Sequence, residues 1–220
     1  APLAPDSNLF VEGKEAAFQK GLEVLAQLTP GKVYLGLNAK SQPASAYTNA
    51  TGVEKHYFHG KHPVGNVGVQ IHNTKPMATQ DVVWTMGVQD VITMGTLFTQ
   101  GKFDAERVVV LAGAELKEPK YVKTHIGAAV ADLIKDNITD EDITVRLISG
   151  DVLSGTQVGE DGFLSFFDDQ VTAIKEGDYN EVFGWLLPLA PRPSISRTMP
   201  GFLMPSFEYR AAVSYTHLTL

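Results

Sequence analysis

The amino-acid sequence predicts an α/β protein whose second half is a β-grasp, or ubiquitin-like, unit. Two observations indicate this fold class. An amphipathic helical pattern over residues 13–32 is followed at once by a short apolar strand at residues 33–37, which is typical of an α/β layer. Residues 107–150 then read as strand, strand, helix and strand, which is the order of a small β-grasp fold.

The first half contains two expected helices separated by irregular stretches. In residues 13–32, apolar side chains recur every three or four positions, and a Pro-Gly pair ends the helix. Residues 38–53 are small and polar, which predicts a long exposed loop. Residues 81–87 are apolar and predict a short strand, and residues 88–101 predict a helix that ends at a glycine.

The second half is expected to be rich in strands. Its apolar runs predict strands at residues 107–113 and 143–150, and residues 117–124 are expected to be a turn that leads into another strand. Between the last two strands, a helical apolar pattern predicts a short helix at residues 127–136. Three later segments are expected to be strands or strands followed by turns, at residues 162–169, 170–177 and 181–188.

The composition excludes several classes of function. A net charge of -7 and a pI near 5.3 leave no basic stripe for a nucleic-acid partner. The absence of cysteine excludes disulfides, thiolate zinc sites and cysteine-ligated iron–sulfur clusters within this sequence. No apolar run approaches the roughly 20 residues that cross a bilayer, and the first residues lack a signal-peptide pattern. We therefore expect a chain in the cytoplasm or facing it.

Histidines gather in residues 56–74, which hold four of the six in the chain, namely His56, His59, His62 and His72. Side chains three positions apart on a strand point to opposite faces, so the spacing does not suit a shared metal ion. Glu54 is the only nearby carboxylate, and no cysteine can complete a tetrahedral site. No metal site is predicted, and polar loop histidines are the expected alternative.

Phosphate-binding and catalytic motifs are also absent from the sequence. Gly60, Gly65 and Gly68 have the wrong spacing for a dinucleotide fingerprint. The pair Gly150 and Gly155 has P-loop spacing, but the lysine that grips phosphates is missing. There is no Gly-x-Ser-x-Gly elbow, no cysteine nucleophile and no EF-hand pattern. We therefore predict no catalytic residues and no cofactor-binding residues in this chain.

Several stretches nevertheless resemble the A subunit of the bacterial sodium-translocating NADH:quinone oxidoreductase, in order from about residue 5 to about residue 200. They include GLEVLAQLTPGKVYLGL, YFHGKHPVGNVGVQIHNTKP, VQDVITMGTLFTQGKFDAERVVVLAG, ITVRLISGDVLSGT and EVFGWLLP. Where that family typically has His-Pro-Ala-Gly, this sequence has His62-Pro63-Val64-Gly65, with Gly68 and His72 in place. The valine is a mild departure from the family pattern.

The resemblance carries expectations about the fold. That family is similar to the NADH-binding flavoprotein of respiratory complex I and to the C subunit of the Rnf complex, which implies a Rossmann-like α/β domain followed by a soluble-ligand-binding β-grasp module. We therefore expect a Rossmann-like domain, truncated at its N-terminus, over residues 1–105 and the β-grasp module over residues 106–156. A further β-rich family segment is expected over residues 157–210. Residues 211–220 leave the family pattern and are expected to be foreign sequence.

The resemblance also implies a role within a complex. It implies a peripheral subunit, on the cytoplasmic face of the bacterial inner membrane, that assists quinone reduction or assembly without its own redox cofactor. NADH, the flavins and the iron–sulfur centre would lie in partner subunits, and the membrane-embedded quinone-site subunit is the expected neighbour. The isolated chain is then not expected to be catalytic. Two alternatives stay open, a flavin- and NADH-binding electron-input protein and a purely structural docking adaptor.

Six residues are expected to face a quinone or a partner subunit, namely His59, His62, Gly65, Gly68, His72 and Trp84. The glycines and Pro63 would let the backbone approach a neighbouring surface. A quinone head group would require hydrogen-bond donors inside an apolar pocket, which the three histidines would supply with Trp84 or Phe58 as walls. The alternative is that these are loop histidines satisfied by backbone groups.

Overall fold

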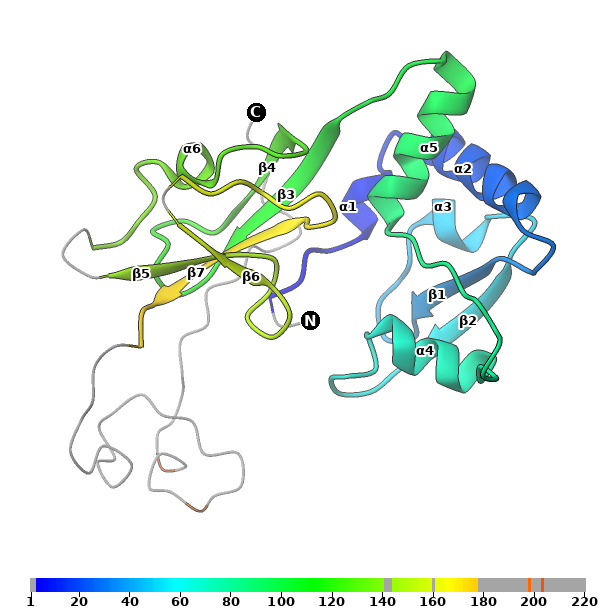
Figure 1. Ribbon diagram of the computed structural model, residues 1–220, viewed down its shortest axis with the longest axis horizontal. Coiled ribbons are helices and arrows are strands. Elements are labelled where there is room, and N and C mark those ends of the chain that lie inside the picture. Colours follow the sequence, from blue (N-terminus) through cyan, green and yellow to red (C-terminus); the bar gives the residue numbers. More distant parts are fainter. Residues whose placement is uncertain (1–2, 141–143, 160, 178–197, 199–202, 204–220) are drawn as a thin grey trace.

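The computed structural model describes residues 3–140, 144–159, 161–177, 198 and 203. In this part of the chain, two bodies of secondary structure lie side by side (Figure 1). One is an α/β domain that runs from α1 to α5, and the other is a five-stranded sheet that carries α6. Among the helices in the described residues, none combines the length and the apolar character that crossing a membrane requires.

The α/β domain is built around a parallel pair of strands with a helical crossover. Strands β1 and β2 pair in parallel, and α3 lies in the connection between them. Helices α2 and α5 lie on one side of this pair and α4 on the other (Figure 1). This layering is that of a Rossmann-like α/β domain. Its elements are α1 (Asn8–Val11), α2 (Glu15–Leu28), β1 (Tyr34–Asn38), α3 (Ser45–Thr48), β2 (Glu54–Phe58), α4 (Val67–Thr74) and α5 (Val88–Gln100).

Helices α2 and α5 cross at very close range because glycines face each other at the contact. A Cβ atom on Gly95 would lie 1.7 Å from the carbonyl oxygen of Ala17, and one on Gly21 would lie 2.1 Å from that of Val91. No side chain fits in this space. Around the crossing, Phe18, Leu22, Val91 and Ile92 are buried in one core cluster, so the helical pattern in the sequence correctly marks the packed faces.

The second body is a β-grasp sheet. Strand β3 (Glu106–Ala112) pairs with β4 (Lys120–His125) in antiparallel fashion and with β7 (Gln170–Lys175) in parallel. The complete strand order is β4-β3-β7-β5-β6, with β5 (Val145–Ser149) and β6 (Thr156–Val158) at the far side. Helix α6 (Val130–Ile134) contributes two buried side chains, Val130 and Ile134, to the core between this helix and the sheet. The predicted β-grasp fold is confirmed.

The sheet extends past the expected module boundary at residue 156. Strand β7 lies between β3 and β5, so residues 170–175 form a central strand of the same sheet. The strand predicted at residues 170–177 is confirmed, but its place in the β-grasp sheet was not predicted, because it depends on pairing with β3 and β5, which lie far away in the sequence. The expected strand at 181–188 and the expected foreign segment at 211–220 lie outside the described residues.

Three local predictions from the sequence are wrong. Residues 38–53 are not a simple exposed loop, because they contain α3, whose Tyr47 is only 3% exposed and packs edge-on against Phe18. Residues 81–87 form no strand and are exposed throughout, since no neighbouring strand offers them a ladder. Residues 162–169 contain only an isolated bridge, between Phe163 and Ala129. Strand β1 is also less buried than expected, with Leu37 as its one buried residue.

The glycine crossing gives the first test of this fold. We expect Gly95→Ala to lower the free energy of unfolding by about 1–3 kcal/mol or more, because overpacking the helix contact outweighs the roughly 1 kcal/mol gain in helix propensity. Chemical denaturation would measure the change. Gly159→Ala is the matched control, since nothing lies within 4 Å of a Cβ at that position. An unchanged stability of the Gly95→Ala variant would contradict the close crossing.

Candidate functional site

The histidine segment spans a strand end, a turn and a helix. His56 lies in β2, where its ring lies 5.6 Å from that of Tyr34. His59 and His62 lie in the connection between β2 and α4, and His72 lies in the last turn of α4. The expectation of loop histidines therefore fits only His59 and His62. The sequence does not predict the helix around His72, because α4 is short and its glycine weakens the helical signal.

All six predicted site residues are exposed. Within the described residues, the imidazoles of His59, His62 and His72 form no hydrogen bond or ion pair, so no backbone group satisfies them. Trp84 is 83% exposed, which is unusual for so large an apolar side chain. The structure places these residues on the stretch between β2 and α5, in which no residue is buried, and gives none of them a role in the core.

Gly65 and Gly68 have no structural need to be glycine in this chain. Nothing lies within 4 Å of a Cβ at either position, and neither residue has left-handed backbone geometry. Gly68 is the second residue of α4, where glycine is less favourable than alanine by about 1 kcal/mol. A bare backbone on an open helix face allows a neighbouring surface to approach closely.

Helix α4 is attached to the domain along one side only. The side-chain amide of Gln70 lies against β1, because a Cβ on Gly36 would come within 2.4 Å of its Oε1 atom. On the other side of β1, Leu35 and Leu37 enter the core that α2 and α5 share. None of the residues of α4 is buried. The outer side of the helix is therefore open.

Residues 75–87 continue from α4 as a fully exposed segment without regular structure (Figure 1). A turn gives the segment its shape, since Asp81 accepts a hydrogen bond from the backbone N–H of Ala78 at 2.9 Å and its own N–H donates to the Ala78 carbonyl at 3.0 Å. Its exposed apolar side chains are Met77, Val82, Val83, Trp84 and Met86. Such a concentration of exposed apolar side chains is typical of an interaction surface.

Within the described part of the chain, these residues are not part of a metal cluster. In the described ranges, no group of three or more His, Cys, Asp or Glu side chains is placed to hold a metal ion. An open hollow of about 330 Å³ lies elsewhere on the α/β domain, beside the ion pair of Lys32 and Glu54, and none of the six predicted residues lines it. With all six predicted residues exposed and apolar side chains exposed beside them, the surface around α4 has the character of a contact surface.

The two domains are joined by a shared hydrophobic core. Phe10 and Val11 of α1 pack in one cluster with Val108, Val110 and Tyr121 of the β-grasp sheet. The Tyr121 hydroxyl also accepts a hydrogen bond from the backbone N–H of Asp6 at 2.9 Å. Because the same cluster contains the apolar faces of α2 and α5, the packing is continuous from one domain to the other.

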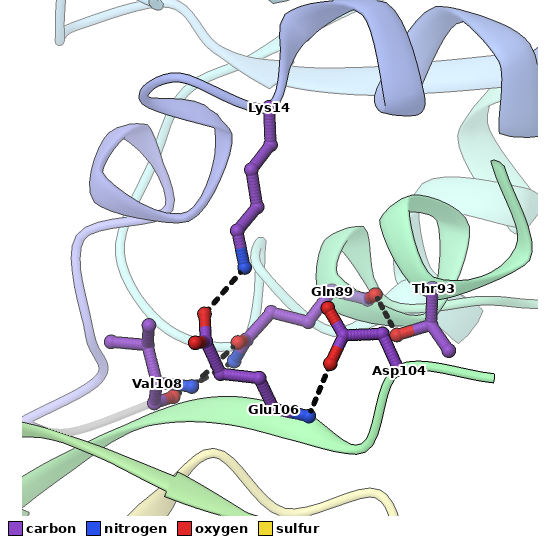
Figure 2. Close-up of polar contacts among 6 residues, drawn as sticks. All are labelled: Lys14, Gln89, Thr93, Asp104, Glu106 and Val108. Carbon is purple, nitrogen blue, oxygen red and sulfur yellow. Dashed lines mark hydrogen bonds and ion pairs between the residues drawn. The ribbon is translucent and has the colours of Figure 1, made fainter. Parts of the chain in front are cut away.

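Polar contacts reinforce this junction (Figure 2). The side-chain amide of Gln89 in α5 brackets Val108 of β3, donating to its carbonyl and accepting from its N–H, both at 2.8 Å. Gln89 thereby continues the sheet ladder at a position that β7 does not reach. Lys14 pairs with Glu106 at 2.7 Å beside it.

A buried charge cluster completes the junction. Arg107, only 3% exposed, donates to the Asp90 carboxylate at 2.8 Å and to the Phe166 carbonyl at 2.9 Å. Burial raises the pKa of the nearby Asp169 to about 6, against the opposing influence of the Arg107 guanidinium. Asp168 and Asp90 add to the upward shift of this pKa.

The residues at the junction were not among the predicted site residues. Gln89, Asp90, Arg107 and Asp169 belong to no motif, and each is separated from its partners by long stretches of sequence. The only local signal is an arginine that opens the otherwise apolar strand 107–112, and that pattern is equally typical of an exposed strand end.

The structure thus defines a two-domain protein in which an α/β domain is fixed to a β-grasp domain and carries an exposed apolar surface at its outer helix. Two family models match this chain. One, described as the NqrA second alpha/beta domain, matches residues 1–103, and the other, described as the NQRA C-terminal domain, matches residues 108–160. The boundary between the two matches falls where the connection from α5 enters β3. The chain therefore belongs to the NqrA family.

Several curated relatives are named as the A subunit of Na(+)-translocating NADH-quinone reductase. The protein of Shewanella frigidimarina (strain NCIMB 400) is 43% identical over 214 residues, which are 97% of this chain and 47% of the relative. That of Yersinia pestis bv. Antiqua (strain Angola) is 40% identical over 202 residues, 91% of this chain and 44% of the relative. That of Vibrio atlanticus (strain LGP32) is 40% identical over 203 residues, which are 92% of this chain and 44% of the relative. The chain spans about half the length of the relatives it matches.

The two hydrogen bonds between Gln89 and Val108 predict a specific loss of stability when Gln89 is replaced. We expect Gln89→Leu to lower the free energy of unfolding by about 2 kcal/mol, because it leaves the buried N–H and carbonyl of Val108 unpaired. Gln19 brackets the exposed Thr51 in the same way, at 3.2 Å and 3.0 Å, so Gln19→Leu is the matched control and should cost much less. Equal losses in the two variants, measured by urea unfolding, would contradict the role of Gln89 at the junction.

The Asp169 carboxyl predicts a pH dependence of stability. Since its pKa is raised to about 6, the folded chain binds the proton more tightly than the unfolded chain, and stability falls as the pH rises from about 4 to about 6. The loss is on the order of 3 kcal/mol at most. We expect Asp169→Asn to remove this slope in urea unfolding across that pH range. Asp132→Asn, at an exposed position of α6, should keep the wild-type slope, and a wild-type slope in Asp169→Asn would refute the assignment.

Proposed function

We propose that this chain forms part of a peripheral subunit of a sodium-translocating NADH:quinone reductase, where it assists quinone reduction or assembly of the complex without a redox cofactor of its own. The names of its relatives support the complex, since relatives at 40% to 43% identity are called the A subunit of that reductase. The two family models match residues 1–103 and 108–160, and the similarity to the Shewanella frigidimarina relative covers 97% of this chain, including both domains.

The observation that carries the peripheral role is the exposed surface around α4. The six residues predicted to face a quinone or a partner are all exposed, and the fold of the chain uses none of them in its core. Segment 75–87 adds five large exposed apolar side chains to the same stretch of chain. Surfaces of this kind mark sites of protein or ligand contact.

The partners in this proposal are the other subunits of the complex, and in particular the membrane-embedded subunit with the quinone site. The chain would then lie on the cytoplasmic face of the bacterial inner membrane, with NADH, the flavins and the iron–sulfur centre in its partners. The alternative of an electron-input flavoprotein has less support, because the sequence lacks both the glycine-rich fingerprint and any cysteine ligand. The adaptor alternative differs only in leaving the quinone affinity of the complex untouched.

A quinone is the second candidate for contact with this surface. His59, His62 and His72 offer unused hydrogen-bonding groups, while Trp84 and the half-buried Phe58 offer apolar ring faces. A quinone head group is bound in a concave, largely apolar site. Since the surface around α4 is open, a partner subunit would supply the remaining walls of such a site.

A chimeric subunit tests the proposal directly. Residues 5–177 of this chain would replace the matching region of the Shewanella frigidimarina relative, and the chimera would be expressed with the other subunits of that complex. We expect the chimera to copurify with the complex and to support NADH-dependent quinone reduction, while the purified chimeric subunit is colourless and gives no NADH titration signal. The unmodified relative serves as the positive control.

Three other outcomes would change the conclusion. Failure of the chimera to join the complex would contradict the proposed subunit role. A bound flavin or a tight NADH signal in the purified chimera would support the alternative that the chain is an electron-input flavoprotein. Loss of assembly on deleting residues 106–156, with an unchanged quinone KM in the residual complex, would favour the structural adaptor.

A further inference from the structure

We propose that the surface made by α4, the turn before it and segment 75–87 docks onto a protein partner whose contact surface combines carboxylates with an apolar recess. We call this surface the α4 face and define it by Lys61, His62, Gly65, Gly68, His72, Lys75 and Trp84, with the apolar side chains of segment 75–87. The inference rests on the proposed function, which it deepens by assigning the chemistry of the partner.

The charge of the α4 face differs from that of the whole chain. The chain carries a net charge of -7, yet residues 55–80 contain three lysines and no Asp or Glu. Lys55 is used internally, since its ammonium donates to the Thr48 carbonyl at 2.6 Å. Lys61 and Lys75 are exposed, and within the described residues neither has an ion-pair partner. A partner with carboxylates opposite these two lysines would complement the charge.

Segment 75–87 contributes the exposed apolar side chains of the α4 face. Val82 is 78% exposed and Trp84 is 83% exposed. Asp81, the one acidic residue of segment 75–87, is occupied in the turn with Ala78. Tryptophan is among the residues that most often dominate binding energy when they enter a pocket of a partner. An apolar recess in the partner that receives Trp84 would complement this part of the surface.

The glycines favour a close protein contact. Gly68 is less favourable than alanine in a helix by about 1 kcal/mol, and no contact or backbone conformation within the described chain requires it. Gly65 is equally open. A tightly packed partner surface requires a flat backbone at such positions, whereas a fluid lipid surface adapts to a methyl group without loss.

Two exposed lysines on an acidic chain also favour a protein over an anionic bilayer. Each lysine near an anionic membrane surface contributes only about 1 kcal/mol. The net charge of -7 opposes that attraction. On a protein partner, by contrast, two carboxylates can be placed opposite two lysines while the rest of the chain stays clear of the contact.

The test measures the affinity of the chimeric subunit for the complex that lacks its own A subunit. We expect Trp84→Ser to weaken binding at least about tenfold, as for a central interface residue. Lys61→Glu combined with Lys75→Glu should weaken binding by a similar factor and reduce its salt dependence. The matched controls are Leu28→Ser, which removes a side chain that is 63% exposed on α2, and Lys102→Glu at another exposed position. Both controls should bind as the parent chimera does.

The Gly68→Ala variant distinguishes an effect on binding to the complex from an effect on folding. We expect this variant to be at least as stable as the parent chimera in thermal unfolding, because its methyl group meets nothing within 4 Å in the chain. It should nevertheless bind the complex less tightly, while Gly159→Ala, which is equally open, binds normally. Reduced binding with retained stability cannot come from misfolding, so this pair identifies the surface that docks.

The outcomes distinguish this inference from the proposed function. If the parent chimera binds and all the variants of the α4 face bind equally well, the α4 face is not the docking surface, and the proposed function still stands. If the parent chimera does not bind, the proposed function fails and the inference fails with it. Binding to vesicles of phosphatidylcholine and phosphatidylglycerol that is lost in Trp84→Ser would overturn the protein partner in favour of a membrane surface.

Discussion

Strand β3 is buried on both faces, and both domains depend on that burial. Val108, Val110 and Ala112 face α1 and the α/β core, while Val109 and Leu111 face the core beneath the β-grasp sheet. The same strand pairs with β4 on one edge and with β7 on the other. Because apolar burial is the main favourable term in folding, neither core can lose β3 and stay closed. The strand therefore sets the relative position of the two domains.

The start of β3 adds specificity to this packing. Arg107 and Asp90 form a buried pair between the domains at 2.8 Å, and Gln89 extends the ladder beside them. Buried ion pairs cost desolvation and contribute little net stability, but a wrong docking would leave each charge unpaired at a much larger cost. Asp169, kept partly neutral near pH 6 by burial that raises its pKa, lowers the negative charge of the same region. The junction is thus defined by apolar packing and aligned by polar contacts.

The far end of the α/β domain has the opposite character. Helix α4 contributes no buried residue, and segment 75–87 exposes its apolar side chains to solvent. The α/β domain is therefore packed against the β-grasp sheet at one end and open to solvent at the other. The proposal that the chain docks through the surface around α4 rests on this contrast.

The long helices α2 and α5 and the β-grasp order of strands can be predicted from the amino-acid sequence. The helices and strands among them rest on local periodicity, which reports the face of an element that is buried. Three further features depend on packing between residues that are far apart in the chain. The side chain of Tyr47 is buried although it lies in a polar stretch, β7 lies in the sheet between β3 and β5, and Trp84 remains exposed. In each case a contact between residues far apart in the chain, or the lack of one, sets the outcome. The sequence of an apolar run such as residues 81–87 does not by itself show whether a partner strand lies beside it.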